Sequence, residues 1–273
     1  MVSTVNIRAG ASGPGNRIGN AIASASARTG VDFDYLMNQA RIESSFDPNA
    51  RARTSSATGL YQFIDQTWLG TVKDHGAKHG LGWAADAIHG RSGRYSVPDA
   101  ETRRAILDLR NHPEAASAMA AEFASDNRDY LEARLGRPME SVDLYLAHFL
   151  GAGGAEEFLG AYAADPSTPA ASILPAAARA NRSIFYRPDG SARSVAEIRD
   201  NFAAKLGTES GPSFAAPQYA AMGATLPMPA APHRFTHAAG AEEADRGIRP
   251  IAKPSAEFAR ISYEMLSKIG ASA

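Results

Sequence analysis

Cysteine is absent from the 273 residues of this chain. Disulfide bonds, thiolate metal sites and a thiol nucleophile are therefore excluded. No hydrophobic run approaches the roughly 20 residues that a membrane-spanning helix needs. An excess of charge of one sign is also missing, since 28 Lys and Arg face 29 Asp and Glu. The sequence therefore predicts neither a nucleic-acid partner nor a membrane span.

Apolar residues recur at helical spacing through much of the chain, and no convincing alternating run predicts a strand. We therefore predict an all-α fold. Residues 74–97 are rich in Gly and His and are expected to form an irregular excursion folded over a cleft. Around it, helices are expected at residues 18–29, 32–44, 65–73, 98–110, 113–135, 141–150, 155–162 and 194–207, with one or two short ones between 169 and 180.

Several helix boundaries are marked by residue types that cap helices. Asp32 and Asp65 are expected to be N-caps, with Ile64 and Leu69 forming a hydrophobic staple around Asp65. Capping-box spacing occurs at two other helix starts, Asn111 with Glu114 and Ser194 with Glu197. Glycine is expected to end three helices, at Gly30, Gly136 and Gly207, and to break one at Gly151.

Composition divides the chain into four parts. Residues 1–15 are rich in Gly and Ser and are expected to be a flexible tail, followed by a folded domain over residues 16–207. Residues 208–254 are rich in Ala, Pro and Gly, which is typical of a linker. Residues 255–273 contain an amphipathic stretch, expected to form a short helix that docks on its own domain or on a partner protein.

The candidate catalytic residue is Glu43. Leu36, Ala40 and Glu43 are spaced so that one face of a helix carries all three, and Pro48 follows soon after the helix end. Burial at the end of an apolar stripe favours the neutral form of a carboxyl group, which a general acid requires. A surface glutamate at a frayed helix end is the alternative.

Two sequence blocks follow this glutamate in order, Glu43-Ser-Ser-Phe-Asp-Pro-Asn-Ala50 and Ser56-Ala-Thr-Gly-Leu-Tyr-Gln-Phe63, and then Trp68. Residue type, order and spacing together resemble the lytic transglycosylases of the soluble-lytic (SLT) type, in the lysozyme-like superfamily. The resemblance implies a goose-type or SLT-type helical domain with a flexible Pro/Ala-rich C-terminal extension. It also implies that Glu43 is the catalytic acid.

The resemblance assigns further residues to the sugar-binding cleft. Gln62 matches the family's glutamine in G-L-M-Q, and Tyr61 takes the methionine position. Tyr61 could stack on a sugar or simply pack in the core. The family's serine, nine residues after its glutamate, has no exact match here because the loop is longer by one residue. Ser55 is favoured for that hydroxyl over Thr54 and Ser56.

A third block, Tyr145 to Gly153, resembles the family's A-Y-N-A-G-P-G but departs from it at two positions. His148 stands where the family has a tyrosine that hydrogen-bonds near the catalytic glutamate, and Phe149 stands at the asparagine. A histidine ring N–H could make a similar hydrogen bond. We therefore expect His148 in the substrate cleft, with a satisfied core histidine as the alternative.

Other constellations give weaker indications. His75 and His79 are four residues apart, but no Glu follows His75, so the H-E-x-x-H metal motif is absent. Asp47 is better explained by turn formation, and Asp65 by helix capping, than by catalysis. Neither a metal nor a cofactor is expected.

The resemblance implies peptidoglycan glycan strands as the binding partner. It also implies cleavage between MurNAc and GlcNAc with formation of a 1,6-anhydro-MurNAc end. A hydrolytic muramidase and a non-catalytic peptidoglycan-binding scaffold are the alternatives. Such a substrate predicts a place in the periplasm or cell wall. The first 30 residues lack the apolar segment of a signal peptide, so the export route stays open, and an export or appendage machine is one setting.

Overall fold

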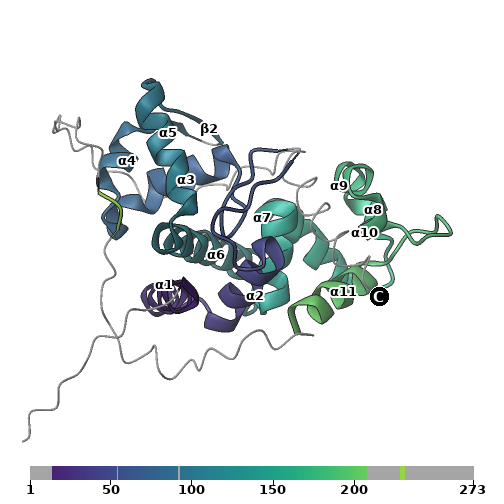
Figure 1. The fold of residues 1–273 in the computed structure, drawn as a ribbon. Helices are drawn as coiled ribbons and strands as arrows, with labels where there is room; N and C mark the ends of the chain where they lie inside the picture. Colours follow the sequence, from purple (N-terminus) through teal and green to yellow (C-terminus); the bar gives the residue numbers. More distant parts are fainter. Residues whose placement is uncertain (1–13, 54, 92, 208–227, 231–273) are drawn as a thin grey trace, which may run out of the picture.

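The computed structural model describes residues 14–53, 55–91, 93–207 and 228–230. Over these residues the chain is helical except for short connections and one small hairpin of strands (Figure 1). The all-α class predicted from the sequence is therefore confirmed.

The helices, 3-10 helices (η) and strands are α1 (Pro14–Thr29), α2 (Phe33–Ser44), α3 (Asp65–His75), η1 (Gly76–His79), α4 (Gly82–Ala87), β1 (His89–Arg91), β2 (Arg94–Ser96), α5 (Ala100–Asp108), η2 (Leu109–Asn111), α6 (Pro113–Leu135), α7 (Ser141–Ala164), α8 (Ala170–Ile173), α9 (Pro175–Ala180), α10 (Arg182–Phe185) and α11 (Val195–Gly207).

Helix α6 lies at the centre, with α1 against it, the α3–α5 region on one side and α7 with α8–α11 on the other (Figure 1). Its first turns are alanine-rich, and residues 113–122 are buried all round. A helix that is apolar on every side belongs in a core, and alanines let neighbouring helices approach closely. The buried Trp68 on α3 adds a hydrogen bond from its indole N–H to the Ile106 carbonyl, at 2.7 Å.

Most of the predicted helix boundaries are confirmed. Asp32 caps α2, its carboxylate accepting a hydrogen bond from the Tyr35 N–H at 2.8 Å. Ser194 and Glu197 form the expected capping box at the start of α11. Gly30 and Gly136 follow α1 and α6 with φ of +70° and +67°, the left-handed conformation that favours glycine.

Three local predictions are wrong. Asp65 is the first residue of α3 and makes ion pairs, while its predecessor Ile64 takes the N-cap position. His112 takes the N-cap of α6, and Glu114 pairs with Arg17 of α1 instead of joining a capping box. In both places a partner distant in sequence captures the acidic side chain.

The third correction concerns chain path. The excursion at 74–97 is ordered as η1, α4 and the antiparallel β1–β2 hairpin. The break predicted at Gly151 is confirmed, because φ of 74° and ψ of 161° at this residue are not helical and α7 consists of two helical parts that meet there at a kink. The second part continues to Ala164, beyond the predicted end at residue 162.

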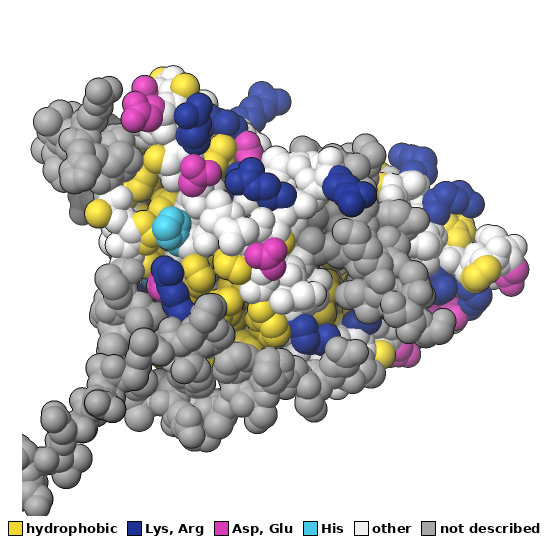
Figure 2. All heavy atoms as spheres, viewed as in Figure 1, with side chains coloured by type: hydrophobic (Ala, Val, Ile, Leu, Met, Phe, Trp, Pro, Cys, Tyr) yellow, Lys and Arg dark blue, Asp and Glu magenta, His cyan; other side chains and the backbone are white. Residues whose placement is uncertain are grey.

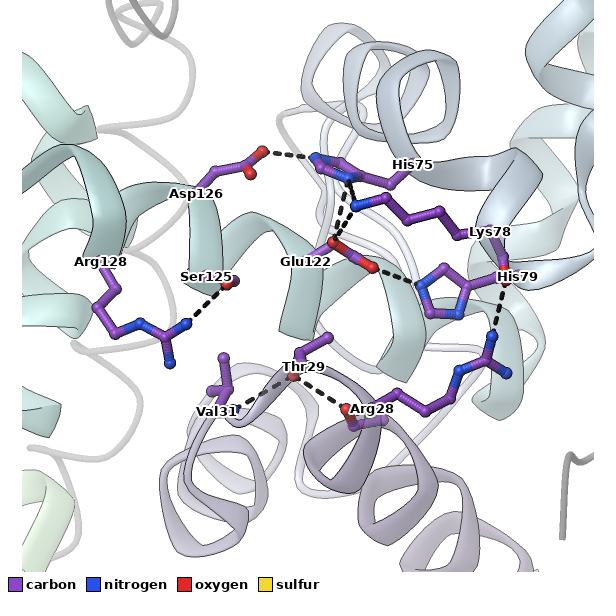
Figure 3. A network of polar contacts seen from close by, with 11 residues as sticks. Arg28, Thr29, Val31, His75, Lys78, His79, Glu122, Ser125, Asp126 and Arg128 are labelled. Carbon is purple, nitrogen blue, oxygen red and sulfur yellow. Dashed lines mark hydrogen bonds and ion pairs between the residues drawn. The ribbon is translucent and has the colours of Figure 1, made fainter. Parts of the chain in front are cut away.

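A buried polar network attaches the excursion to α6 (Figure 3). His75 lies between two carboxylates, with Nδ1 3.0 Å from Glu122 Oε2 and Nε2 2.7 Å from Asp126 Oδ2. His79 Nε2 lies 2.7 Å from Glu122 Oε1, and Lys78 Nζ lies 3.3 Å from Glu122 Oε2. Glu122 thus contacts three basic side chains, which belong to α3 and η1.

The charge state of His75 follows from these partners. Burial lowers the pKa of His75, but the hydrogen bonds and charges of Asp126 and Glu122 outweigh it and raise that pKa to about 9. The pKa of Glu122 is shifted downward in return, because the hydrogen bonds from His75 and His79 outweigh its burial. Near neutral pH the network is therefore an ion-pair cluster.

The face seen in Figure 2 carries basic and acidic side chains interspersed over the described residues, as the nearly balanced composition implies. No helix among the described residues is long and apolar enough to cross a bilayer. The predicted N-terminal tail, linker and C-terminal helix lie outside the described residues, except that residues 14 and 15 form the start of α1 and residues 228–230 are described. Met228 is half-buried and lines a small pocket with Arg28 and His79.

The His75 network predicts a pH-dependent stability. A histidine whose pKa is raised on folding stabilises the fold fully below its unfolded pKa of about 6.5, and that stabilisation is lost as pH rises through about 9. Urea unfolding should therefore show His75→Asn far less stable than the parent near pH 6, with this difference narrowing between about pH 6.5 and 9. The exposed His89→Asn is the control and should follow the parent. If the difference in stability between His75→Asn and the parent did not change with pH, the assignment of a charged His75 would be contradicted.

Candidate active site

Glu43 lies in the last turn of α2, on the face that packs into the core. Leu36 and Ala40 on that face are fully buried, and the Glu43 side chain is only 2% exposed. The helix ends directly after it, because Ser45 and Phe46 take positive φ values of 53° and 63°. The buried stripe predicted from the sequence is therefore present, and the alternative of a frayed surface glutamate is wrong.

Two side chains of α7 reach the carboxyl group of Glu43. His148 Nε2 lies 3.1 Å from Oε1, and the Tyr145 hydroxyl donates to the same oxygen at 3.5 Å. His148 and Tyr145 are three residues apart and therefore lie on one side of the helix. The structure thus brings together Glu43 and His148, which are more than a hundred residues apart in the sequence.

Tyr145 is a contact that the sequence analysis missed. Its ring is 1% exposed, and burial together with the charge of Glu43 raises the pKa of Tyr145 well above its ordinary value. Burial and the same charge also raise the pKa of Tyr35, whose ring is 2% exposed. Both tyrosines therefore remain neutral hydroxyl groups beside the carboxyl. The i, i+3 spacing of Tyr145 and His148 was the available signal.

The Gly-Leu-Tyr-Gln loop is held by a buried arginine. Arg110 donates to the carbonyls of Ser56 and Phe63 and to Asp65 Oδ1, each at 2.9 Å. Burial lowers the pKa of Arg110, and the Asp65 carboxylate opposes that shift. The loop also passes very close to this residue: a Cβ added to Gly59 would lie 2.0 Å from the Arg110 carbonyl oxygen.

Gln62 and Tyr61 are both buried in this loop. The Gln62 amide donates to the carbonyls of Gly59 at 2.8 Å and Ala50 at 3.1 Å, and φ at Gln62 is +48°. Its Oε1 is buried without a hydrogen-bond partner among the described residues. Tyr61 is 1% exposed, which is the core-packing arrangement. Stacking on a sugar stays a prediction, and it would require the loop to open.

The serines of the first loop have local partners. Ser55 Oγ accepts from the Ala57 N–H, and Ser56 Oγ accepts from the Asp65 N–H, both at 3.2 Å. Ser55 is half-buried and Thr54 lies outside the described residues. The choice of Ser55 for the substrate hydroxyl therefore stays a prediction.

The two acidic side chains considered as second catalytic groups are engaged elsewhere. Asp47 Oδ1 accepts from the Asn49 N–H at 2.8 Å, which is the turn arrangement expected for it. Asp65 pairs with Arg103 Nη2 at 2.7 Å and with Arg110. Both carboxylates are therefore accounted for by structure. The described residues hold no cluster of three or more His, Asp or Glu side chains arranged for a metal ion.

A separate groove of about 300 Å³ lies where the N-terminal ends of α2 and α7 meet the C-terminal end of α11. Asp34, Tyr35 and Asn38 line it on one side and Ala203 and Leu206 on the other. Glu43 is not among its lining residues. This groove is therefore distinct from the Glu43 pair, although Tyr35 borders both.

An all-α domain with a buried glutamate at a helix end, contacted by side chains of a second helix, is consistent with a lysozyme-like helical domain. Residues 20–81 match the family of the transglycosylase SLT domain. The resemblance inferred from the sequence is therefore confirmed. The matched segment contains Glu43, Ser55, Tyr61 and Gln62, whereas His148 and Tyr145 lie outside it.

The close approach at Gly59 predicts a large loss of stability for Gly59→Ala. The added Cβ would meet the Arg110 backbone, and φ of +85° already disfavours any L side chain. We expect a loss of at least about 4 kcal/mol in the free energy of unfolding. Gly136→Ala is the matched control, because φ is +67° but the space is open. It should cost about 1–2 kcal/mol. Equal losses would contradict the role assigned to the contact.

Proposed function

We propose that this protein is a peptidoglycan lytic transglycosylase that cleaves the β-1,4 bond between MurNAc and GlcNAc. The observation that carries the proposal is the Glu43 carboxyl, buried in an SLT-matched segment and contacted by His148 and Tyr145 of α7. The SLT family acts on peptidoglycan, which supports the substrate class.

Glu43 acts first as the acid in the proposed mechanism. Protonated, it gives its proton to the glycosidic oxygen as the bond to C1 of MurNAc breaks. The substrate's own N-acetyl group then supports the electron-poor C1. Glu43, now a carboxylate, takes the proton of the C6 hydroxyl as that oxygen attacks C1. The product carries a 1,6-anhydro ring, and the glutamate regains its starting state.

The engagement of Asp47 and Asp65 favours this route over hydrolysis with two carboxyl groups. Glycosidases of the usual kind place a second Asp or Glu across the bond from the acid. The two candidates named by the sequence, Asp47 and Asp65, are held by a turn and by two arginines. A muramidase using Glu43 with water is the alternative within this fold.

The substrate-binding roles rest on the resemblance together with local geometry. We assign Gln62, Ser55, Tyr61 and His148 to the cleft around the scissile bond. Gln62 fits best, because an amide oxygen without a partner among the described residues can accept from a sugar hydroxyl or N-acetyl N–H. His148 contacts Glu43 directly and so borders the reacting atoms.

The substrate places the proposed activity where peptidoglycan is, in the periplasm or cell wall. Local opening of the wall by an export or appendage machine is one setting, and a partner bound through the C-terminal segment would direct it there. A peptidoglycan-binding scaffold without activity is the second candidate. It is favoured by the departure of the third block from the family pattern and by the amphipathic C-terminal stretch of the sequence, which resembles a segment that docks on a partner.

Replacing Glu43 tests the proposed acid. Glu43→Gln keeps the shape of the side chain but carries no transferable proton, so release of fragments from purified sacculi should fall by about 10²–10⁴-fold. The melting temperature should stay close to that of the parent. The exposed Glu157→Gln on α7 is the control and should retain full activity. If the turnover rate of Glu43→Gln stayed within tenfold of the parent rate, a residue other than Glu43 would have to be the acid.

The mass of the products distinguishes a lytic transglycosylase from a hydrolytic muramidase. Intramolecular attack by C6 consumes no water, so the released fragments should be about 18 Da lighter than hydrolytic products. Mass spectrometry of digested sacculi measures this difference directly. A majority of fragments with reducing ends would instead establish a muramidase. Intact sacculi that bind the protein would point to the scaffold.

A further inference from the structure

The two oxygens of the Glu43 carboxyl have different surroundings. Oε1 receives both contacts from α7, from the Tyr145 hydroxyl and from His148 Nε2. No hydrogen bond from a described residue reaches Oε2. A carboxyl oxygen has two lone-pair directions, so the Tyr145 hydroxyl and a His148 ring protonated at Nε2 together leave little room for a proton on Oε1.

Tyr145 is built to keep its hydroxyl at this oxygen. The ring is 1% exposed and packs 5.4 Å from the Phe202 ring of α11 and 5.9 Å from the His148 ring, measured between centroids. Its hydroxyl has Oε1 as its hydrogen-bond partner within the described part of the chain. A contact of 3.5 Å is long, but such bonds commonly shorten once substrate is bound.

We propose that Tyr145 and His148 are positioning residues that hold Oε1, so that Oε2 is the atom that gives and takes the catalytic proton. This inference deepens the proposed function and rests on it. Tyr145 O–H and His148 Nε2–H donate to Oε1 throughout the cycle. They fix the plane of the carboxyl group and so direct Oε2 toward the glycosidic oxygen.

The proton balance of the cycle is simple. The Oε2–H proton passes to the glycosidic oxygen as the C1–O bond breaks, which leaves a carboxylate. That carboxylate carries its charge on both oxygens, and the two donors stabilise it at Oε1. The C6 oxygen then bonds to C1, and its proton returns to Oε2. No other reactant is required.

A hydroxyl deletion tests the role of Tyr145. Tyr145→Phe keeps the ring and its packing but removes one donor, so kcat on soluble glycan oligomers should fall by at least about tenfold. KM and melting temperature should change little, because the ring still fills its site. Tyr130→Phe is the matched control: it removes a hydroxyl that donates to a glutamate, Glu156, at 2.6 Å. It should leave kcat unchanged.

His148 gives a second, graded test. His148→Gln retains an N–H donor at a similar reach and should keep most of kcat, whereas His148→Leu removes the donor and should lose about as much as Tyr145→Phe or more. If the double variant Tyr145→Phe/His148→Leu loses no more than the larger single variant, the two donors act as one unit, as proposed. A Tyr145→Phe enzyme with the kcat of Tyr130→Phe overturns the proposal.

Infrared spectroscopy separates this inference from the proposed function, because it needs no turnover. The carbonyl stretch of protonated Glu43 is the band that Glu43→Gln removes. In an acid protonated at Oε2, the carbonyl oxygen is Oε1. Hydrogen-bond donors on Oε1 therefore lower the frequency of the carbonyl stretch. Tyr145→Phe should therefore move the band upward, even if the protein proves to be a scaffold. An unmoved band in Tyr145→Phe, with Tyr130→Phe for comparison, overturns the assignment of the two oxygens.

Discussion

The structure depends on burying one carboxyl group at the point where α2 and α7 meet. A buried polar group without hydrogen bonds is costly, so the α2 glutamate requires donors from another element. The Tyr145 hydroxyl of α7 donates to Glu43, His148 Nε2 of the same helix lies 3.1 Å from the same oxygen, and Phe202 of α11 packs against the Tyr145 ring. The contact therefore joins the SLT-matched segment 20–81 to the helices after residue 141. The two parts of the domain are incomplete without each other at this site.

A second constraint shapes the loop beside the glutamate. An irregular loop leaves some backbone carbonyls without partners in a helix or sheet, and the Arg110 guanidinium donates to those of Ser56 and Phe63, the latter also accepting from the Thr58 N–H. Asp65 balances the charge of this buried arginine. A charged group also holds the excursion at 74–97, where Glu122 of α6 pairs with His75, Lys78 and His79. In both places a charged side chain from the central region adds polar contacts to a segment that also buries apolar residues, such as Leu60 and Ile88.

Local patterns in the sequence predicted much of this fold and the centre of its site. Apolar spacing placed Glu43 on a buried face, and cap residues gave the starts of α2 and α11 and the end of α6, because these depend only on neighbours within a few positions. Two of the failures were of one kind. Asp65 and Glu114 have the residue type of caps but bind Arg103, Arg110 and Arg17, which are distant in sequence. Tyr145 was missed for the same reason, since only the packing of α7 against α2 shows which of its side chains face the carboxyl.

The third sequence block illustrates why position outweighs residue identity at such a site. When residue types alone are compared with the family pattern, His148 and Phe149 are departures and weaken the case for an active enzyme. Placed in the fold, Phe149 is 1% exposed and packs against Phe202, with ring centroids 5.2 Å apart, while His148 points at Glu43 from the same turn. What a general acid requires is a donor at the right distance, and either a hydroxyl or an imidazole N–H can serve. Because α7 presents Tyr145 and His148 three residues apart, both a hydroxyl and an imidazole nitrogen lie against the same oxygen. The departure in sequence is thus compatible with a complete set of contacts around the glutamate.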